Sequence, residues 1–195
     1  MPAGMKYNLD PIAAEKELCN QKTIYRLAGG FNLEDDTLPQ GALIPHLAPL
    51  AVDFATRKAK VVKNVKIAED AGASVTSLKI EKGSFAYVGM FIGTGAKGAA
   101  VSAIDKTNPG YDTITVAAAV GAAVTKGQIL FEASAVAGTA VKNVANYLNY
   151  AHAVKVEPGA TVTAVGQAYE IKESRLYVPI SANDKVTLTS RFMFI

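Results

Sequence analysis

The stretch Phe85-Ala-Tyr-Val-Gly-Met-Phe-Ile92 opens the segment that decides the fold, residues 85–132. Further β-prone runs follow at Ala99-Ala-Val-Ser-Ala-Ile104, Tyr111-Asp-Thr-Ile-Thr-Val116 and Gly127-Gln-Ile-Leu-Phe131. Turn residues separate these runs at spacings of roughly ten residues, which is typical of a β-sandwich or barrel. The sequence therefore predicts a mainly β fold of short antiparallel strands in a sandwich or barrel.

Two proline-glycine pairs favour the antiparallel arrangement. Asn108-Pro109-Gly110 and Glu157-Pro158-Gly159 place proline and glycine in the order of the two central positions of a type II turn. Each pair lies between two apolar runs, so each predicts a hairpin.

The C-terminal part of the sequence predicts one helix and two strands. Apolar residues recur at helical spacing near residues 138–149, which predicts a short helix there: Val141, Val144, Ala145 and Leu148. Residues 171–180 and 185–195 are expected to form strands on either side of Ser181-Ala-Asn-Asp184.

Residues 1–40 differ from the rest of the chain and predict an N-terminal arm that is irregular or partly helical. Asp10 before Pro11 would start a helix well, so a weak helix is expected near residues 10–20. The arm has few periodic apolar positions and therefore little surface to bury. We expect a β-rich domain over residues 41–195, with possible sub-units 41–135 and 136–195.

Composition and charge exclude several classes of protein. Of the 195 residues, 50% are hydrophobic and the net charge is +3, too mild for the clustered basic face of a nucleic-acid-binding protein. No apolar run reaches the roughly 18 residues of a membrane helix. Cys19 is the one cysteine, and no signal-peptide pattern opens the chain. We therefore expect a protein made in a reducing cytoplasm, with no membrane and no nucleic acid as partner.

A lysine-rich run, residues 55–67, predicts a strand. Lys58, Lys60 and Lys66 share one face at period two, while Lys63 interrupts the apolar face. One interpretation is a basic stripe for an acidic partner. The favoured interpretation is a solvated face that protects an edge strand from unwanted pairing.

The segment Gly93-Thr-Gly-Ala-Lys-Gly98 matches the glycine pattern of dinucleotide-binding loops and follows an apolar strand. Only about ten residues separate it from Asn108-Pro-Gly, too few for the helix that this pattern requires. Nucleotide binding through Gly93–Gly98 is therefore a weak alternative.

No other residues form a recognisable site in the sequence. His46 and His152 are the two histidines, and neither has a second histidine or a cysteine at metal-binding spacing. Asp105 and Asp112 flank one hairpin, and hydrogen bonding to their own turns is the common role of such residues. The sequence predicts no catalytic, cofactor-binding or metal-binding residues.

Several segments resemble the phage head fiber proteins and similar capsid-associated proteins of prophages. They are Pro49-Leu-Ala-Val-Asp53, Ala103-Ile-Asp105, Asn108-Pro-Gly-Tyr-Asp-Thr-Ile-Thr-Val116 and Lys126-Gly-Gln-Ile-Leu-Phe-Glu-Ala133. The resemblance covers roughly residues 38–195. It implies a non-enzymatic structural protein of a phage or prophage virion that sits on the capsid surface, contacts the major capsid protein and is usually trimeric. Such a protein would be synthesised in the bacterial host cytoplasm.

The short chain departs from this family by lacking a long repetitive shaft, which favours capsid decoration over a true fibre. A second alternative remains open, a bacterial adhesion or carbohydrate-binding β module. That function needs an aromatic platform, for which the material is six of the eight tyrosines: Tyr87, Tyr111, Tyr147, Tyr150, Tyr169 and Tyr177.

Overall fold

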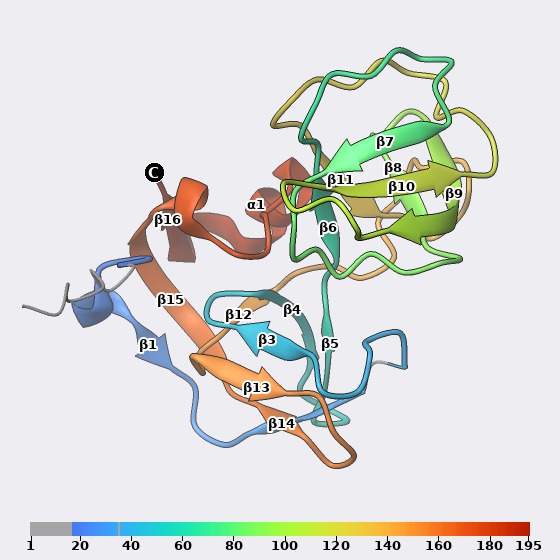
Figure 1. Ribbon diagram of the computed structural model, residues 1–195. Helices are drawn as coiled ribbons and strands as arrows, with labels where there is room; N and C mark the ends of the chain where they lie inside the picture. Colours follow the sequence, from blue (N-terminus) through green and yellow to red (C-terminus); the bar gives the residue numbers. More distant parts are fainter. Residues whose placement is uncertain (1–16, 35) are drawn as a thin grey trace, which may run out of the picture.

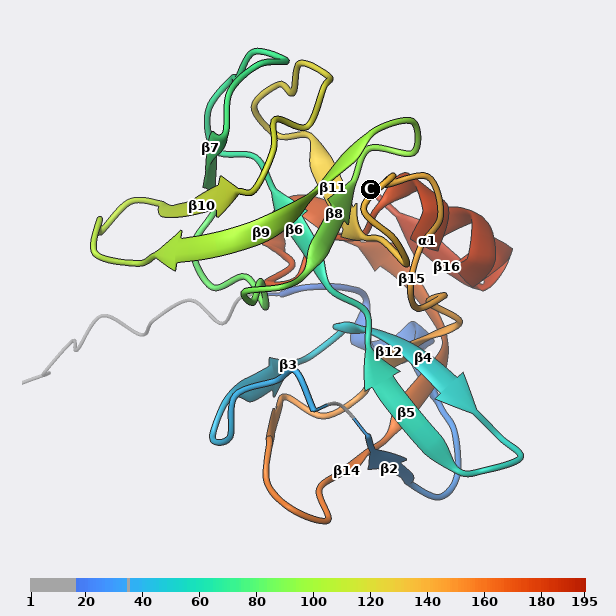
Figure 2. The same cartoon turned by 90° about the vertical axis from the view of Figure 1, so that its right-hand side faces the viewer.

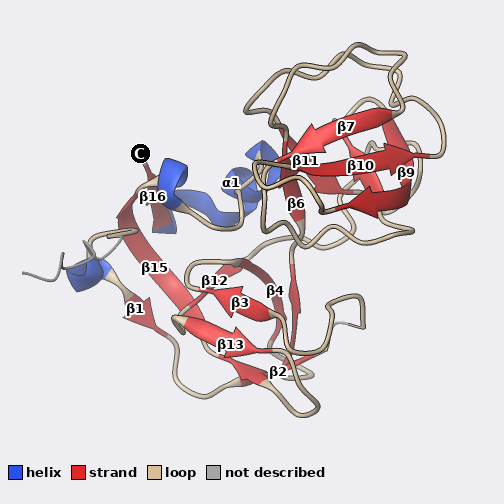
Figure 3. Cartoon of the chain, viewed as in Figure 1, coloured by secondary structure: helices blue, strands red, loops and turns tan. Residues whose placement is uncertain are grey.

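The computed structural model describes residues 17–34 and 36–195 and is mainly β, as the sequence predicts. Two lobes stand one above the other in Figure 1. The barrel lobe comprises residues 64–132, and the sheet lobe comprises residues 17–61 and 145–195. Figure 3 shows how little helix the described chain contains.

The barrel lobe is a six-stranded antiparallel sheet in the order β6-β11-β8-β9-β10-β7. Its strands are β6 (Asn64–Lys66), β7 (Ser77–Ile80), β8 (Phe91–Gly93), β9 (Gly98–Asp105), β10 (Asp112–Val116) and β11 (Ile129–Glu132). A bridge between Ile67 and Ile80 and a hydrogen bond of 2.8 Å from the Glu81 amide to the Lys66 carbonyl join β6 to β7. These contacts close the sheet into a small barrel.

Alternation of side chains explains why this segment forms a barrel. In β10, Asp112, Ile114 and Val116 point inward, while the residues between them are more exposed. The interior is filled mainly by branched aliphatic side chains that all come from residues 65–130. The barrel lobe therefore has a core that belongs to one continuous stretch of sequence.

The sheet lobe is assembled from segments that lie far apart in the sequence. Its main sheet has the order β1-β15-β12-β4-β5-β2-β14, and β16 pairs in parallel with β15. The strands are β1 (Tyr25–Arg26), β2 (Phe31–Leu33), β4 (Pro49–Asp53), β5 (Lys58–Val61), β12 (Tyr147–Asn149), β14 (Thr161–Val162), β15 (Ala164–Ile171) and β16 (Phe192–Phe194). A separate pair joins β3 (Leu43–Pro45) to β13 (Ala153–Lys155).

Both faces of the main sheet carry a core. Ala164 packs into a cluster with Phe31, while its neighbour Val165 packs on the opposite face with Leu188. This alternation follows from the period of two along a strand. The face that carries Val165 is covered by the C-terminal segment, which contributes Ile180, Leu188 and Phe192 to its core. Figure 2 shows part of this segment beside the barrel lobe.

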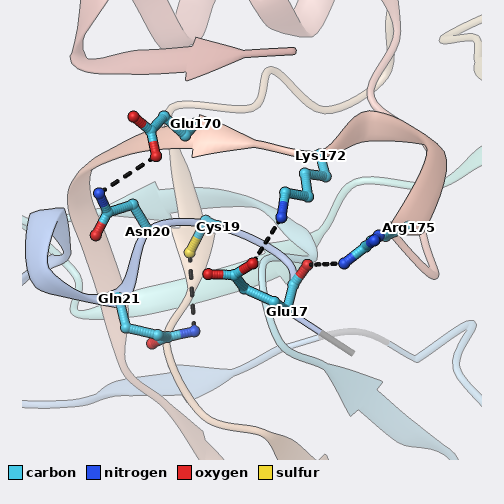
Figure 4. Close-up of polar contacts among 7 residues, drawn as sticks. All are labelled: Glu17, Cys19, Asn20, Gln21, Glu170, Lys172 and Arg175. Atoms are coloured by element: carbon cyan, nitrogen blue, oxygen red, sulfur yellow. Dashed lines mark hydrogen bonds and ion pairs between the residues drawn. The ribbon is translucent and has the colours of Figure 1, made fainter. Parts of the chain in front are cut away.

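Residues 17–34 belong to the sheet lobe, which differs from the arm predicted over residues 1–40. Leu18 and Cys19 are buried in a core, and Phe31 of β2 is fully buried. Figure 4 shows polar contacts that hold the start of the described chain against the end of β15 and the residues that follow it: Glu17 to Lys172 at 2.6 Å, Arg175 to the Glu17 carbonyl at 3.0 Å, and Asn20 to Glu170 at 3.3 Å.

The arm was predicted because the partners of this segment lie about 150 residues away, beyond any local pattern. Residues 1–16, and with them most of the predicted helix near residues 10–20, lie outside the described residues. From that range the structure describes residues 17–20, which are not helical and precede a 3₁₀ turn, η1 (Gln21–Thr23). The boundary at residue 41 and the sub-units 41–135 and 136–195 stay predictions about folding units.

The predicted helix near residues 138–149 is wrong. Residues 147–149 form β12, and the Asn146 amide exchanges two hydrogen bonds of 2.8 Å with the backbone of Val52. Asn149 donates to the Pro45 carbonyl at 2.9 Å. Asparagine side chains compete with the helical backbone for hydrogen bonds, and here they bind neighbouring strands instead.

The two predicted C-terminal strands are largely wrong as well. β15 ends at Ile171, a 3₁₀ turn η2 (Glu173–Arg175) follows, and α1 (Ala182–Leu188) lies where a strand over residues 185–195 was expected. A capping box explains α1, because Ser181 and Asp184 satisfy each other's backbone amides. A second 3₁₀ turn, η3 (Thr189–Arg191), leads into β16.

The lysine-rich run forms two strands in different lobes. β5 and β6 follow one another along the chain and connect the lobes (Figure 1). Lys58 and Lys60 are exposed to solvent, as the favoured interpretation expects, but β5 is an interior strand between β4 and β2. Lys63, at the junction, is only 1% exposed.

A buried polar contact fastens the lobes together beside that junction. The Asn64 amide of β6 donates to Asp184 of α1 at 2.7 Å and to the Pro179 carbonyl at 2.8 Å. Burial raises the pKa of the Asp184 carboxyl, and hydrogen bonds from Ser181 and Asn64 partly oppose that rise. We call this set, Asn64, Ser181 and Asp184, the lobe clamp.

Candidate functional site

The Gly93–Gly98 segment forms the tight hairpin between β8 and β9. Thr94 closes it by accepting from the Lys97 amide at 3.1 Å and donating to the Lys97 carbonyl at 3.0 Å. A strand follows the glycines, so the helix N-terminus that a dinucleotide site needs is missing here. The hairpin therefore gives no support to the nucleotide-binding alternative.

The glycines have a packing role instead. A Cβ atom on Gly98 would lie 2.5 Å from the Gly138 Cα atom, and one on Gly93 would lie 2.5 Å from the Gly138 oxygen. The Gly95 amide also donates to the Gly138 carbonyl at 3.0 Å. Residues 135–140 thus pack directly on the hairpin, and three glycines allow their backbones to touch.

A groove of about 490 Å³ lies between β4, β5 and residues 142–146. Its charged and polar side chains are Glu34, Asp53, Thr56, Lys58, Lys60, Lys142, Asn143 and Asn146. Residues 142–146 lie within the segment 138–149, for which the sequence wrongly predicted a helix. The groove could therefore not be expected from the sequence.

Opposite charges are paired within the groove. Lys58 forms an ion pair of 2.6 Å with Glu34, which lowers the pKa of the Glu34 carboxyl. Hydrogen bonds from Thr56 and from the Ala55 amide lower the pKa of Asp53. The Thr56 hydroxyl donates to Asp53 at 2.7 Å and thereby closes the β4–β5 turn. The groove is therefore a polar surface, and its side chains bind to one another and to the backbone of the β4–β5 turn.

A second polar cluster joins the barrel lobe to residues 135–146. Buried Glu132 accepts from the Tyr87 hydroxyl at 2.5 Å and from the Lys142 ammonium at 2.9 Å. Burial and the Glu132 carboxylate raise the pKa of Tyr87. Burial alone would lower the pKa of Lys142, but hydrogen bonds to Tyr87 and Glu132 outweigh it and raise that pKa. The cluster acts as a fixed cross-link between segments.

Three of the six tyrosines are engaged in contacts within the chain. Tyr87 is held in the cluster with Glu132, Tyr147 contacts Phe54 at a centroid distance of 5.4 Å, and Tyr150 contacts His46 at 6.3 Å. These contacts give no support to the adhesion alternative, which needs a shared aromatic platform.

The two aspartates of the β9–β10 hairpin act separately. Asp105 accepts from the Thr107 amide at 2.9 Å, which is the turn-forming role expected for it. Asp112 is buried and pairs with Lys82 at 2.7 Å.

The two histidines, separated widely in the sequence, lie next to each other in the structure. The ring centroids of His46 and His152 are 5.3 Å apart, because β3 pairs with β13 immediately beside them. Burial lowers the pKa of His46. Sequence spacing could not reveal this pair, since the β3–β13 pairing is a tertiary contact.

A family model for the head fiber protein matches residues 3–190, which is nearly the whole chain. The chain belongs to the phage head fiber protein family. This confirms the resemblance found in the sequence and makes the chain a phage structural protein. No curated protein and no solved structure matches it. In the described part of the chain, no helix has the length and apolar character to cross a bilayer.

Proposed function

We propose that this head fiber protein is a non-enzymatic decoration of the capsid, attached to the outer capsid surface through the major capsid protein. We also propose that it acts as a homo-oligomer, with a trimer favoured. The observation that carries the proposal is the family match over residues 3–190.

The C-terminal end of the sheet lobe offers a surface suited to such contacts. Val186 of α1, Met193 of β16 and Ile195 are 77%, 45% and 62% exposed. β16 bonds to β15 on one side, and among the described strands nothing pairs with its other side. Exposed apolar side chains next to an unpaired strand edge are features of protein–protein interfaces. We call this surface the C-terminal patch.

The polar side chains of the groove support a structural role. Its acids are engaged by Lys58, Thr56 and backbone amides, and its asparagine Asn146 binds Val52. No described residue of the groove is a histidine or cysteine that could activate or serve as a nucleophile. The side chains stabilise the β4–β5 turn and the covering segment.

The test combines electron microscopy of phage particles with binding of the purified chain to capsids that lack it. We expect density for the protein on the capsid exterior, and Met193→Glu should weaken attachment or lower the oligomeric state measured by sedimentation. Val88→Glu is the matched control, because Val88 is 61% exposed and belongs to the barrel lobe. Density confined to the tail, or normal binding by Met193→Glu together with a stable monomer, would contradict the proposal.

A further inference from the structure

His46 and His152 are placed side by side by the backbone. Pro45 and Ala153 are directly paired in the β3–β13 sheet, and the His46 amide donates to the His152 carbonyl at 3.2 Å. The two rings are tilted by 31°, with centroids 5.3 Å apart. His152 is exposed, so the pair is open to solvent on one side.

Two buried polar groups beside the pair are incompletely hydrogen-bonded. His46 is 6% exposed, and neither ring nitrogen makes a hydrogen bond of good geometry, although the Tyr150 backbone lies within reach of the ring. The Asn149 oxygen is also buried without a partner, although its amide nitrogen donates to the Pro45 and Ala151 carbonyls. Buried polar atoms are nearly always satisfied, so unpaired ones indicate a site for a water or a ligand.

The separation of the rings fits a shared metal ion. Zinc binds an imidazole nitrogen at about 2.0–2.1 Å, which places the ring centroid about 3.2 Å from the metal. Two rings held at a tetrahedral angle would then have centroids about 5.2–5.3 Å apart. The observed separation is 5.3 Å. We propose that His46 and His152 form a two-imidazole binding site for a borderline divalent transition metal of the zinc class.

Ligand chemistry selects this class of metal. Imidazole suits zinc, copper and nickel, whereas magnesium and calcium prefer sets of oxygen ligands. No third His, Cys, Asp or Glu joins the two histidines in the described part of the chain, so water completes the coordination. Arg26 lies 5.5 Å over the ring of Tyr150, which itself contacts His46. The metal would fasten β3 to β13, the smallest sheet of the fold.

The experiment uses the tag-free full chain, because a polyhistidine tag would bind the same ions. Calorimetric titration with Zn²⁺ should give one ion per chain, and Co²⁺ should give a visible absorption band from imidazole coordination. When free Zn²⁺ stands about 100-fold above its Kd, the Tm should rise by roughly 5–10 °C. Mg²⁺ should leave the Tm unchanged.

Variants assign the binding to the pair. His152→Ala, at an exposed position, should abolish the Tm rise and the Co²⁺ band while keeping the fold. His46→Gln is a second variant with the same expected loss, and Lys155→Ala, in β13 three residues after His152, is the control that retains binding. Absence of Zn²⁺ binding by the wild-type chain overturns the proposal, and so does binding that survives His152→Ala.

Discussion

The barrel lobe and the sheet lobe use opposite routes to a β fold. All core residues of the barrel lobe come from residues 65–130, so its paired strands lie closer in the chain, with β6 and β11 the most distant pair at about 65 residues. The sheet lobe pairs β1 with β15 and β2 with β14, across more than a hundred residues each. Local pairing closes short loops, while distant pairing requires the whole chain. The N-terminal strands therefore stabilise the sheet lobe and not the barrel lobe.

Backbone conformation separates the lobes in the same way. Every described positive-φ residue of the barrel lobe is a glycine. The four described non-glycine residues with positive φ all lie in the sheet lobe: Leu47, Arg57, Glu170 and Thr189. Such conformations cost free energy and persist only where surrounding contacts enforce them. The barrel lobe is thus built with little local strain, and the sheet lobe is held by its tertiary contacts.

Removal of residues 1–34 should have the largest effect and would separate the lobes. This deletion takes away β1, β2 and the buried side chains of Leu18, Cys19 and Phe31. We expect the sheet lobe to lose cooperative unfolding, while amides of the barrel lobe keep their protection in hydrogen exchange. Calorimetry and hydrogen exchange measure the two outcomes.

Removal of residues 1–16 alone is the control for that deletion. It leaves all described contacts of the sheet lobe, so unfolding should stay cooperative. If both deletions have the same effect on cooperative unfolding, residues 1–40 act as a single arm. Residues 17–34 would then not be a separate part of the sheet lobe.

Gly98→Val should destabilise the barrel lobe by about 3 kcal/mol, because the new side chain would overlap Gly138 and the Ile92 oxygen. Gly95→Ala is the matched control within the same hairpin. Its Cβ atom meets open space, so only the cost of a positive φ remains, about 1 kcal/mol. Urea unfolding gives both values. Equal losses in the two variants would show that contact with residues 135–140 is unimportant.

Asn64→Ala should break the lobe clamp at a cost of about 2 kcal/mol, since a buried carboxylate loses a hydrogen-bond donor. The thermal transition should broaden or split, because the lobes then unfold less cooperatively. Asn183→Ala, at an exposed position of the same helix, is the control with little change.

The clamp also predicts a pH dependence. The pKa of Asp184 is raised in the folded state, so its contribution favours the fold at low pH and is lost as pH rises through that pKa. Asn64→Ala removes a donor to the ionised carboxylate. The loss in free energy of unfolding caused by Asn64→Ala should therefore be larger at pH 7 than near pH 4. An equal loss at both pH values would show that the Asp184 carboxylate does not cause it.

Thr189→Gly should have the smallest effect and the opposite sign. Thr189 has a φ of 61° at the end of α1, a conformation that a β-branched side chain tolerates poorly. Glycine removes this strain, and we expect a gain of about 1 kcal/mol. Chemical denaturation measures it. A loss of stability would show that the weak hydrogen bond of 3.4 Å from Arg191 to the threonine hydroxyl outweighs the strain.

The mainly β class and the family could be predicted from the sequence alone, and residues 85–132 could be recognised as a run of short strands, with sandwich and barrel both left open. Alternation along residues 85–132 and glycine turns are local properties, so they could be interpreted without the fold. The spacing of the chain also predicted that no helix follows Gly98, and β9 lies there.

The sheet lobe and its polar sites depend on contacts between segments that lie far apart in the sequence. Asn146 and Asn149 weakened a helix in the sequence, but their strand partners Val52 and Pro45 lie about a hundred residues away. His46 and His152 become neighbours only when β3 pairs with β13. A local pattern fixes which conformations a segment prefers, and the choice among them came from hydrogen bonds and burial that distant segments supply.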